Sequence, residues 1–266
     1  MKEYLLEAKK EFFTRLDCEA KKIVKLLIKS ELTGKKSATK HLLWVIHQLY
    51  KAEKTNFLNN EGFKSSYHNP ITSDLEFLVA RVLFHYSIQE KLSWTIFLRC
   101  QEKDMCSCLN KRKKIKSFKM AAPDIRVVKD GKTIAIIEIK ARVGWMQLCF
   151  SKERKKYYEE KVRNGAEINI KKETDRLKIQ IEKYQEHFQV PPKKIYLLLP
   201  SLSNAHRMKS GESYEDHENW VSKNSGLPRR NLIFLSKNLK LNLAGVWDDA
   251  QLDVTNKFES MPLFNK

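Results

Sequence analysis

Several features that define other protein classes are missing from this 266-residue sequence. No apolar run approaches the roughly 20 residues that a membrane-spanning helix requires. Residues 1–4 read Met-Lys-Glu-Tyr and open an amphipathic pattern, not the apolar stretch of a signal peptide. Internal repeats and low-complexity tracts are also absent. We therefore expect a soluble, cytoplasmic protein with no membrane partner.

Cysteine is scarce, and its distribution excludes a disulfide framework. The chain has five cysteines, an odd number, scattered at positions 18, 100, 106, 108 and 149. Cys100, Cys106 and Cys108 could begin a zinc site, but no fourth ligand follows at the usual spacing. Reduced cysteines are the better interpretation.

Acidic residues are few relative to basic residues. Lys and Arg total 51 against 32 Asp and Glu, which gives a net charge of +19. An excess of this size indicates a polyanionic partner, and nucleic acid is the default, with an anionic membrane surface as the competitor. We expect DNA, without excluding RNA, and a homodimer is possible.

Residues 124–140 form the most informative segment. Two β-branched runs flank Lys129-Asp130-Gly131-Lys132, and Asp-Gly between such runs predicts a β-hairpin. Asp124 opens the first strand. Because side chains alternate along a strand, Glu138 and Lys140 share one face at the end of the second strand.

These three charges on an apolar hairpin indicate a metal-assisted reaction. Burying them is costly unless they pair or hold a metal. Carboxylates are the hard oxygen ligands that Mg²⁺ prefers, with Mn²⁺ as a substitute. A lysine beside them can orient a water and neutralise charge in a transition state. The alternative is an edge hairpin whose charges are simply solvated.

The string Pro123-Asp124, thirteen residues, then Glu138-Ile139-Lys140 resembles the PD-(D/E)XK signature of the restriction-endonuclease-like nuclease superfamily. The resemblance covers about residues 73–200. It implies an α/β fold with a restriction-endonuclease-like core, a mixed central sheet flanked by helices. It also implies a Mg²⁺-dependent phosphodiesterase in which Asp124 and Glu138 bind the metal, the Ile139 carbonyl adds a ligand and Lys140 positions the attacking water.

Within that superfamily, a sequence-specific restriction endonuclease acting on DNA is the leading expectation. A structure-selective or defence-associated nuclease is nearly as well supported. Two other classes remain: an inactive nucleic-acid-binding module of the same fold, and a basic interaction protein whose hairpin charges only imitate the motif.

Two residues outside the hairpin are further candidates. Ser73-Asp74-Leu75-Glu76 matches a capping box, in which Glu76 would bind a backbone N–H. Many superfamily members instead present a metal-binding glutamate from the helix before the first core strand, and by that resemblance Glu76 is the candidate. Gln180 and Tyr184, one turn apart, resemble the Gln-x-x-x-Tyr element of RecB-like branches, where the glutamine approaches the metal. An ordinary amphipathic helix explains Tyr184 but not Gln180.

Periodicity predicts the remaining elements. Two helices, the second with Ser37 as its N-cap, form an N-terminal helical lobe over residues 1–60, and residues 61–266 form the nuclease domain. We expect a helix from Ser73, a strand over 93–99, a helix over 173–188 and strands over 195–200 and 231–235. Residues 201–230 read as a polar loop, and the tail carries one more short helix.

Basic residues concentrate just before the hairpin. Six of the nine residues over 111–119 are Lys or Arg, including Lys111, Arg112, Lys113 and Lys114. Such a run is often a solvated loop or a nuclear localisation patch, but its place before Asp124 favours contact with phosphates. Arg142, just after Lys140, is a further candidate contact to nucleic acid.

Overall fold

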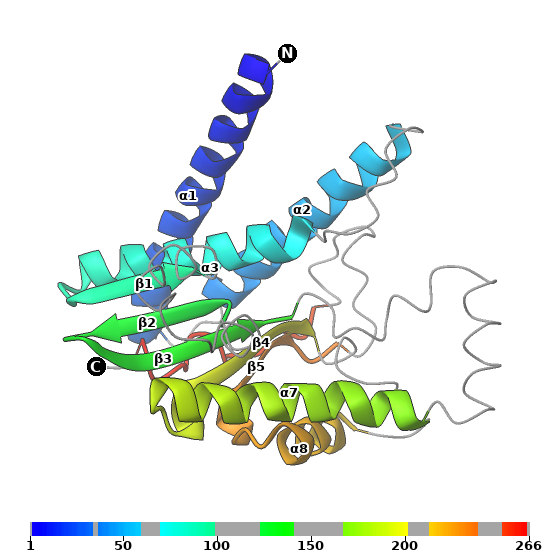
Figure 1. The fold of residues 1–266 in the computed structure, drawn as a ribbon. Helices are drawn as coiled ribbons and strands as arrows, with labels where there is room; N and C mark the ends of the chain where they lie inside the picture. The colour runs from blue at the N-terminus through cyan, green and yellow to red at the C-terminus, as the bar shows by residue number, and fades with distance from the viewer. Residues whose placement is uncertain are drawn as a thin grey trace, which may run out of the picture.

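A computed structural model describes residues 2–33, 37–59, 70–98, 123–140, 167–201, 213–238 and 252–264 (Figure 1). The elements, in chain order, are α1 (Lys2–Thr33), α2 (Ser37–Asn59), α3 (Pro70–Gln89), β1 (Trp94–Leu98), β2 (Ile125–Lys129), β3 (Lys132–Ile139), α7 (Glu167–Phe188), the 3₁₀ turn η3 (Pro192–Lys194), β4 (Ile195–Ser201), α8 (Tyr214–Ser225), the 3₁₀ turn η5 (Arg229–Asn231) and β5 (Leu232–Ser236). Searched over these ranges, no helix combines the length and the apolar character needed to cross a membrane.

The strands form one mixed five-stranded sheet in the order β1-β2-β3-β4-β5. β1, β2 and β3 pair antiparallel, whereas β4 and β5 run parallel to β3. In Figure 1, α1, α2 and α3 lie on one side of the sheet, and α7 and α8 lie on the other. The expected mixed central sheet flanked by helices is therefore confirmed.

The β2–β3 hairpin has the turn that its sequence predicts. Asp130 and Gly131 both adopt positive φ, at 50° and 72°. A two-residue turn of this kind matches the right-handed twist of the strands that it joins, and Asp-Gly tolerates it well. The resulting register places Ile125 opposite Ile137 and Val127 opposite Ala135.

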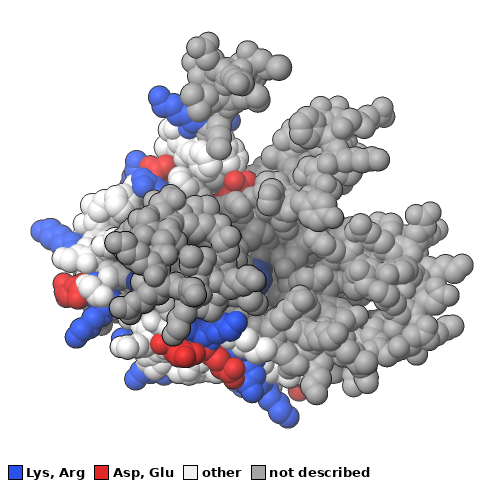
Figure 2. Space-filling view, viewed as in Figure 1, with Lys and Arg blue, Asp and Glu red and all other residues white. Residues whose placement is uncertain are grey.

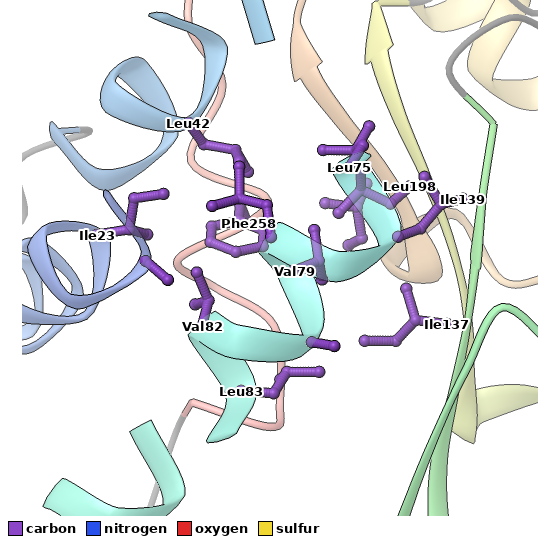
Figure 3. Packing of buried hydrophobic residues seen from close by; sticks show 14 of the residues in the cluster. Ile23, Leu42, Leu75, Val79, Val82, Leu83, Ile137, Ile139, Leu198 and Phe258 are labelled. Carbon is purple, nitrogen blue, oxygen red and sulfur yellow. The ribbon is translucent and has the colours of Figure 1, made fainter. Parts of the chain in front are cut away.

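The two faces of the sheet bury different clusters. Ile137, Ile139 and Leu198 point toward α3 and pack with residues of α1, α2 and the C-terminal segment, as Figure 3 shows for Ile23, Leu42 and Phe258. On the opposite face, Ile136, Leu197 and Phe234 pack against Ile181 and Tyr184 of α7 and Val221 of α8. The division of the chain into a lobe over 1–60 and a nuclease domain over 61–266 stays a prediction.

The C-terminal segment belongs to the first cluster. Phe258, Met261 and Phe264 are buried, and the Tyr86 hydroxyl donates to the Phe264 carbonyl at 2.7 Å. Glu259 accepts from the Thr39 N–H at 2.8 Å and from the Thr39 hydroxyl. A carboxylate from the end of the chain thus occupies the N-terminus of α2, where backbone N–H groups lack helical partners.

Two sequence predictions need correction. Helix α8 lies within the predicted polar loop 201–230: Ser213 and Asp216 form a capping box, and Gly226 ends the helix in the left-handed conformation. Helix α3 begins at Pro70, not Ser73, since proline is well suited to the first turn of a helix. The short helix expected in the tail stays a prediction, since the described residues 252–264 form a bridge at Val254 and turns and residues 239–251 lie outside the described part of the chain.

Candidate active site

Asp124 and Glu138 meet at one end of the sheet. Asp124 immediately precedes β2, and Glu138 is the penultimate residue of β3. The Ile125–Ile137 register brings the two carboxylates together across the hairpin. The Asp124 carboxylate accepts a hydrogen bond from the Ile139 N–H at 2.8 Å, which fixes its position. Both residues are buried, each with only 1% of its surface exposed.

The Glu138 carboxylate has donors on both of its oxygens. Lys140 Nζ and Gln180 Nε2 donate to Oε1, the latter at 3.0 Å, and the Tyr184 hydroxyl donates to Oε2 at 2.8 Å. Gln180 also donates to the Tyr184 hydroxyl. Residues from β3 and α7 thus form one hydrogen-bonded network around a buried carboxylate.

The network places two acidic groups in a low-dielectric environment. Burial raises the pKa of Asp124 well above its ordinary value of 3.8, the neighbouring Glu138 carboxylate raises it further, and Lys140 partly opposes both. Burial and the Glu138 carboxylate also raise the pKa of Tyr184, which therefore stays a hydrogen-bond donor. Two buried carboxylates with one lysine leave an excess of negative charge, which favours binding of a cation.

Glu76 lies close enough to the pair to act on it. Its carboxylate contributes to the raised pKa of Asp124. The alternative capping-box role is wrong, because α3 begins three residues before Ser73 and the serine therefore lies inside the helix. Glu76 is half-buried on α3, the helix that precedes β1.

The donor set fits a magnesium ion in chemistry and in number. Within the described part of the chain, no three His, Cys, Asp or Glu side chains gather into a group that could hold a metal. Mg²⁺ does not require such a cage, because it usually keeps several waters and binds through one or two carboxylates. Asp124 and Glu138 would supply these oxygens, and Lys140, Gln180 and Tyr184 hold the Glu138 carboxylate by hydrogen bonds, as the outer-shell partners of a metal ligand do.

The structure thus brings together Asp124, Glu138, Lys140 and Gln180, with Glu76 nearby. The Ile139 side chain is buried in the first cluster and its N–H binds Asp124, while the role of its carbonyl as a ligand stays a prediction. Sequence reasoning missed the direct bond from Tyr184 to Glu138. The available signal was the four-residue spacing of Gln180 and Tyr184, which places both on one helix face.

The proposed nucleic-acid contacts Lys111, Arg112, Lys113, Lys114 and Arg142 lie outside the described residues. The connection that contains the first four joins Leu98 to Pro123, and Arg142 follows Lys140 by two positions. Leu98, Pro123 and Lys140 all lie at the end of the sheet that holds Asp124 and Glu138.

Comparison with known proteins gives no relative: no protein family, curated protein or solved structure matches this chain.

Proposed function

We propose that this protein is a Mg²⁺-dependent deoxyribonuclease of the PD-(D/E)XK type. The observation that carries the proposal is the buried Asp124–Glu138 pair with Lys140 bound to Glu138. A purely structural ion pair of Glu138 and Lys140 would not need a second buried carboxylate beside it, because burying like charges raises the cost.

The order of elements supports the resemblance in fold. A helix with a glutamate (α3) precedes the first strand, a hairpin carries the two carboxylates, and a crossover helix (α7) leads to a parallel strand (β4). This is the arrangement that the resemblance implies for the catalytic core. The hydrogen bond from Gln180, on the crossover helix, to Glu138 supports the resemblance to the RecB-like element.

In this proposal Asp124 and Glu138 would hold the metal, and Glu76 and the Ile139 carbonyl would be further ligands. When bound, Mg²⁺ would polarise a phosphoryl oxygen and lower the pKa of a coordinated water. Lys140 is one-third exposed at its side chain, in contrast to the buried Glu138, so its ammonium group is accessible to a water or a phosphate. Lys140 therefore orients the attacking water and neutralises developing charge.

Gln180 and Tyr184 have a positioning role. Each donates to Glu138, and together they hold the carboxylate in one orientation. Substrate binding rests on the positive charge of the chain, +19 overall, which favours a phosphate backbone. A restriction endonuclease that reads a specific sequence is the leading form of this function.

Nicking of supercoiled plasmid, with and without Mg²⁺, tests the proposal. We expect cleavage in Mg²⁺ or Mn²⁺, none in excess EDTA, and binding without efficient turnover in Ca²⁺. Lys140→Ala should reduce the single-turnover rate on the order of 100-fold, as loss of one preorganised transition-state contact does, while the protein stays folded and binds DNA. Lys237→Ala, an exposed lysine beyond β5, is the matched control.

Two results would reject this function. One is a folded Lys140→Ala protein that cleaves at the wild-type rate. The other is DNA binding without any cleavage in Mg²⁺ or Mn²⁺, which would favour an inactive nucleic-acid-binding module.

A further inference from the structure

The end of the sheet opposite the candidate site carries a row of basic side chains that the proposed chemistry does not use. They come from four turns: Lys91 before β1, Lys129 and Lys132 at the hairpin, Lys193 and Lys194 in η3, and Arg230 in η5. We call these six residues the basic edge. Figure 2 shows blue side chains on the side of the molecule where the hairpin lies in Figure 1.

The strand directions place these turns together. β2 ends at Lys129, where Trp94 at the start of β1 pairs with it, and β3 begins at Lys132. η3 and η5 lead directly into β4 and β5, which run parallel to β3. The Asn231 side chain in η5 donates to the Pro192 carbonyl of η3 at 3.3 Å and to the Ile195 carbonyl at the start of β4 at 2.8 Å.

Pairing within the protein does not account for these charges. Among the described residues, no carboxylate forms an ion pair with any member of the basic edge, although the same turns carry Glu90 and Asp130. The neighbouring Arg229 differs, since it binds the buried Glu218 at 2.7 Å. Lys129 and Lys132 even stand directly opposite each other in the ladder, an arrangement that destabilises a sheet.

The geometry of the row matches a polymeric anion. Three strand intervals of roughly 4.8 Å separate β2 from β5, and β4 begins opposite Ile136, four residues beyond Lys132, so the cations lie along a diagonal of about 20 Å. A single phosphate ion would contact only one or two of them, whereas a nucleic-acid backbone presents charge every few ångströms along its length.

The hairpin end of the basic edge is separate from the candidate site. Lys132 and Glu138 lie at opposite ends of β3, about 20 Å apart at roughly 3.4 Å per residue. The turns η3 and η5 lie nearer to Glu138 along the strands, because Ile195 pairs with Ile136 and Leu232 with Leu197. Helices cover both faces of the sheet between Lys132 and Glu138 (Figure 1). We infer that the basic edge binds the phosphodiester backbone of a nucleic-acid segment other than the one at the Asp124–Glu138 site.

Salt dependence of DNA binding tests this inference independently of hydrolysis. The edge variant changes Lys129, Lys132, Lys193, Lys194 and Arg230 to Gln. A matched control changes five exposed lysines elsewhere, Lys10, Lys25, Lys40, Lys51 and Lys223, to Gln. Binding of a labelled duplex is measured in EDTA over a range of KCl concentrations, so that no cleavage occurs whether or not the site is catalytic.

We expect the edge variant to flatten the slope of log K against log[salt] by about 4, since each phosphate contact contributes about 0.9. The control should change the slope by less than about 1. Equal slopes for the two variants would overturn the inference, because only net charge would then matter. Wild-type protein should also bring two differently labelled duplexes together, which is measured as energy transfer between the two labels. This energy transfer should be lost in the edge variant and kept in the control variant.

Folding and the membrane alternative are checked in parallel. Melting temperature should be unchanged or raised in the edge variant, because the Lys129–Lys132 repulsion is removed. If that variant does not fold, the double change Lys129→Gln with Lys132→Gln should still flatten the slope by about 2. Edge-dependent binding to phosphatidylserine vesicles, with an unchanged DNA slope, would reject the nucleic-acid assignment.

Discussion

The Tyr184 hydroxyl donates a 2.8 Å hydrogen bond to Oε2 of Glu138, and this bond joins α7 to β3 at the centre of the candidate site. Tyr184 is fully buried, and Phe188 packs one turn further along the helix. The tyrosine therefore fixes the carboxylate from a helix whose own position is set by apolar packing. Outer-shell groups of this kind tune a ligand without touching the substrate.

Tyr184→Phe should lower cleavage by about 10- to 100-fold, the usual effect of losing an outer-shell partner. The phenylalanine keeps the packing, so the free energy of unfolding should fall by no more than about 1–2 kcal/mol. Tyr196→Phe is the matched control, because Tyr196 is another buried tyrosine but faces the opposite cluster. Single-turnover rates over a Mg²⁺ titration measure the effect. Equal rates for the two variants would show that the hydrogen bond from Tyr184 to Glu138 does not contribute to cleavage.

Asp124→Asn should stabilise the metal-free protein above about pH 7. The raised pKa of Asp124 means that the folded state binds more protons than the unfolded state between 3.8 and the folded-state pKa. Stability therefore falls as pH rises through that interval, and the ionised carboxylate remains unfavourable at higher pH. Asparagine removes this charge and can still accept from the Ile139 N–H.

Thermal melting in EDTA measures this difference. The gain in melting temperature should shrink as the pH is lowered below 3.8 toward about 3, where the carboxyl is protonated in both states. Added Mg²⁺ should raise the melting temperature of the wild type but not that of Asp124→Asn, because a ligand stabilises only the state that binds it. A variant that is less stable than the wild type at about pH 8 would contradict the electrostatic account.

Glu76→Gln should reduce cleavage at limiting Mg²⁺ with little change in stability. The glutamine preserves size but removes the charge that acts on Asp124. The melting temperature should not change, because Glu76 lies inside α3 and does not form a capping box at its start. Recovery of cleavage at saturating Mg²⁺ would identify Glu76 as a metal ligand. An unchanged rate at every Mg²⁺ concentration would exclude Glu76 from the site.

Glu259→Ala should destabilise the protein by about 1–2 kcal/mol, the cost of removing a helix cap. The carboxylate binds both the N–H and the hydroxyl of Thr39 at the start of α2. Glu259→Gln keeps an oxygen acceptor and should retain part of the stability. Denaturant unfolding of the two variants measures the difference. Equal stability of Glu259→Ala and wild type would show that this contact contributes nothing.

The sequence by itself determined the hairpin and the helix that faces it. Asp130-Gly131 is a local signal, because few residue pairs tolerate positive φ at two successive positions. Strand alternation then placed Glu138 and Lys140 together, and the periodicity of residues 177–188 put Gln180 and Tyr184 on one helix face. These predictions succeeded because each depends on neighbours within a few residues.

Tertiary structure alone decided the contacts between distant segments. Glu259 binds Thr39 of α2, which is 220 positions away in sequence. Phe258 and Phe264 are buried in the same apolar cluster as residues of α2. The bond from Tyr184 to Glu138 spans 46 positions, and the assembly of the basic edge depends on the directions of five strands. No local pattern encodes such pairings, because they form only when the apolar faces of the sheet and helices are buried together.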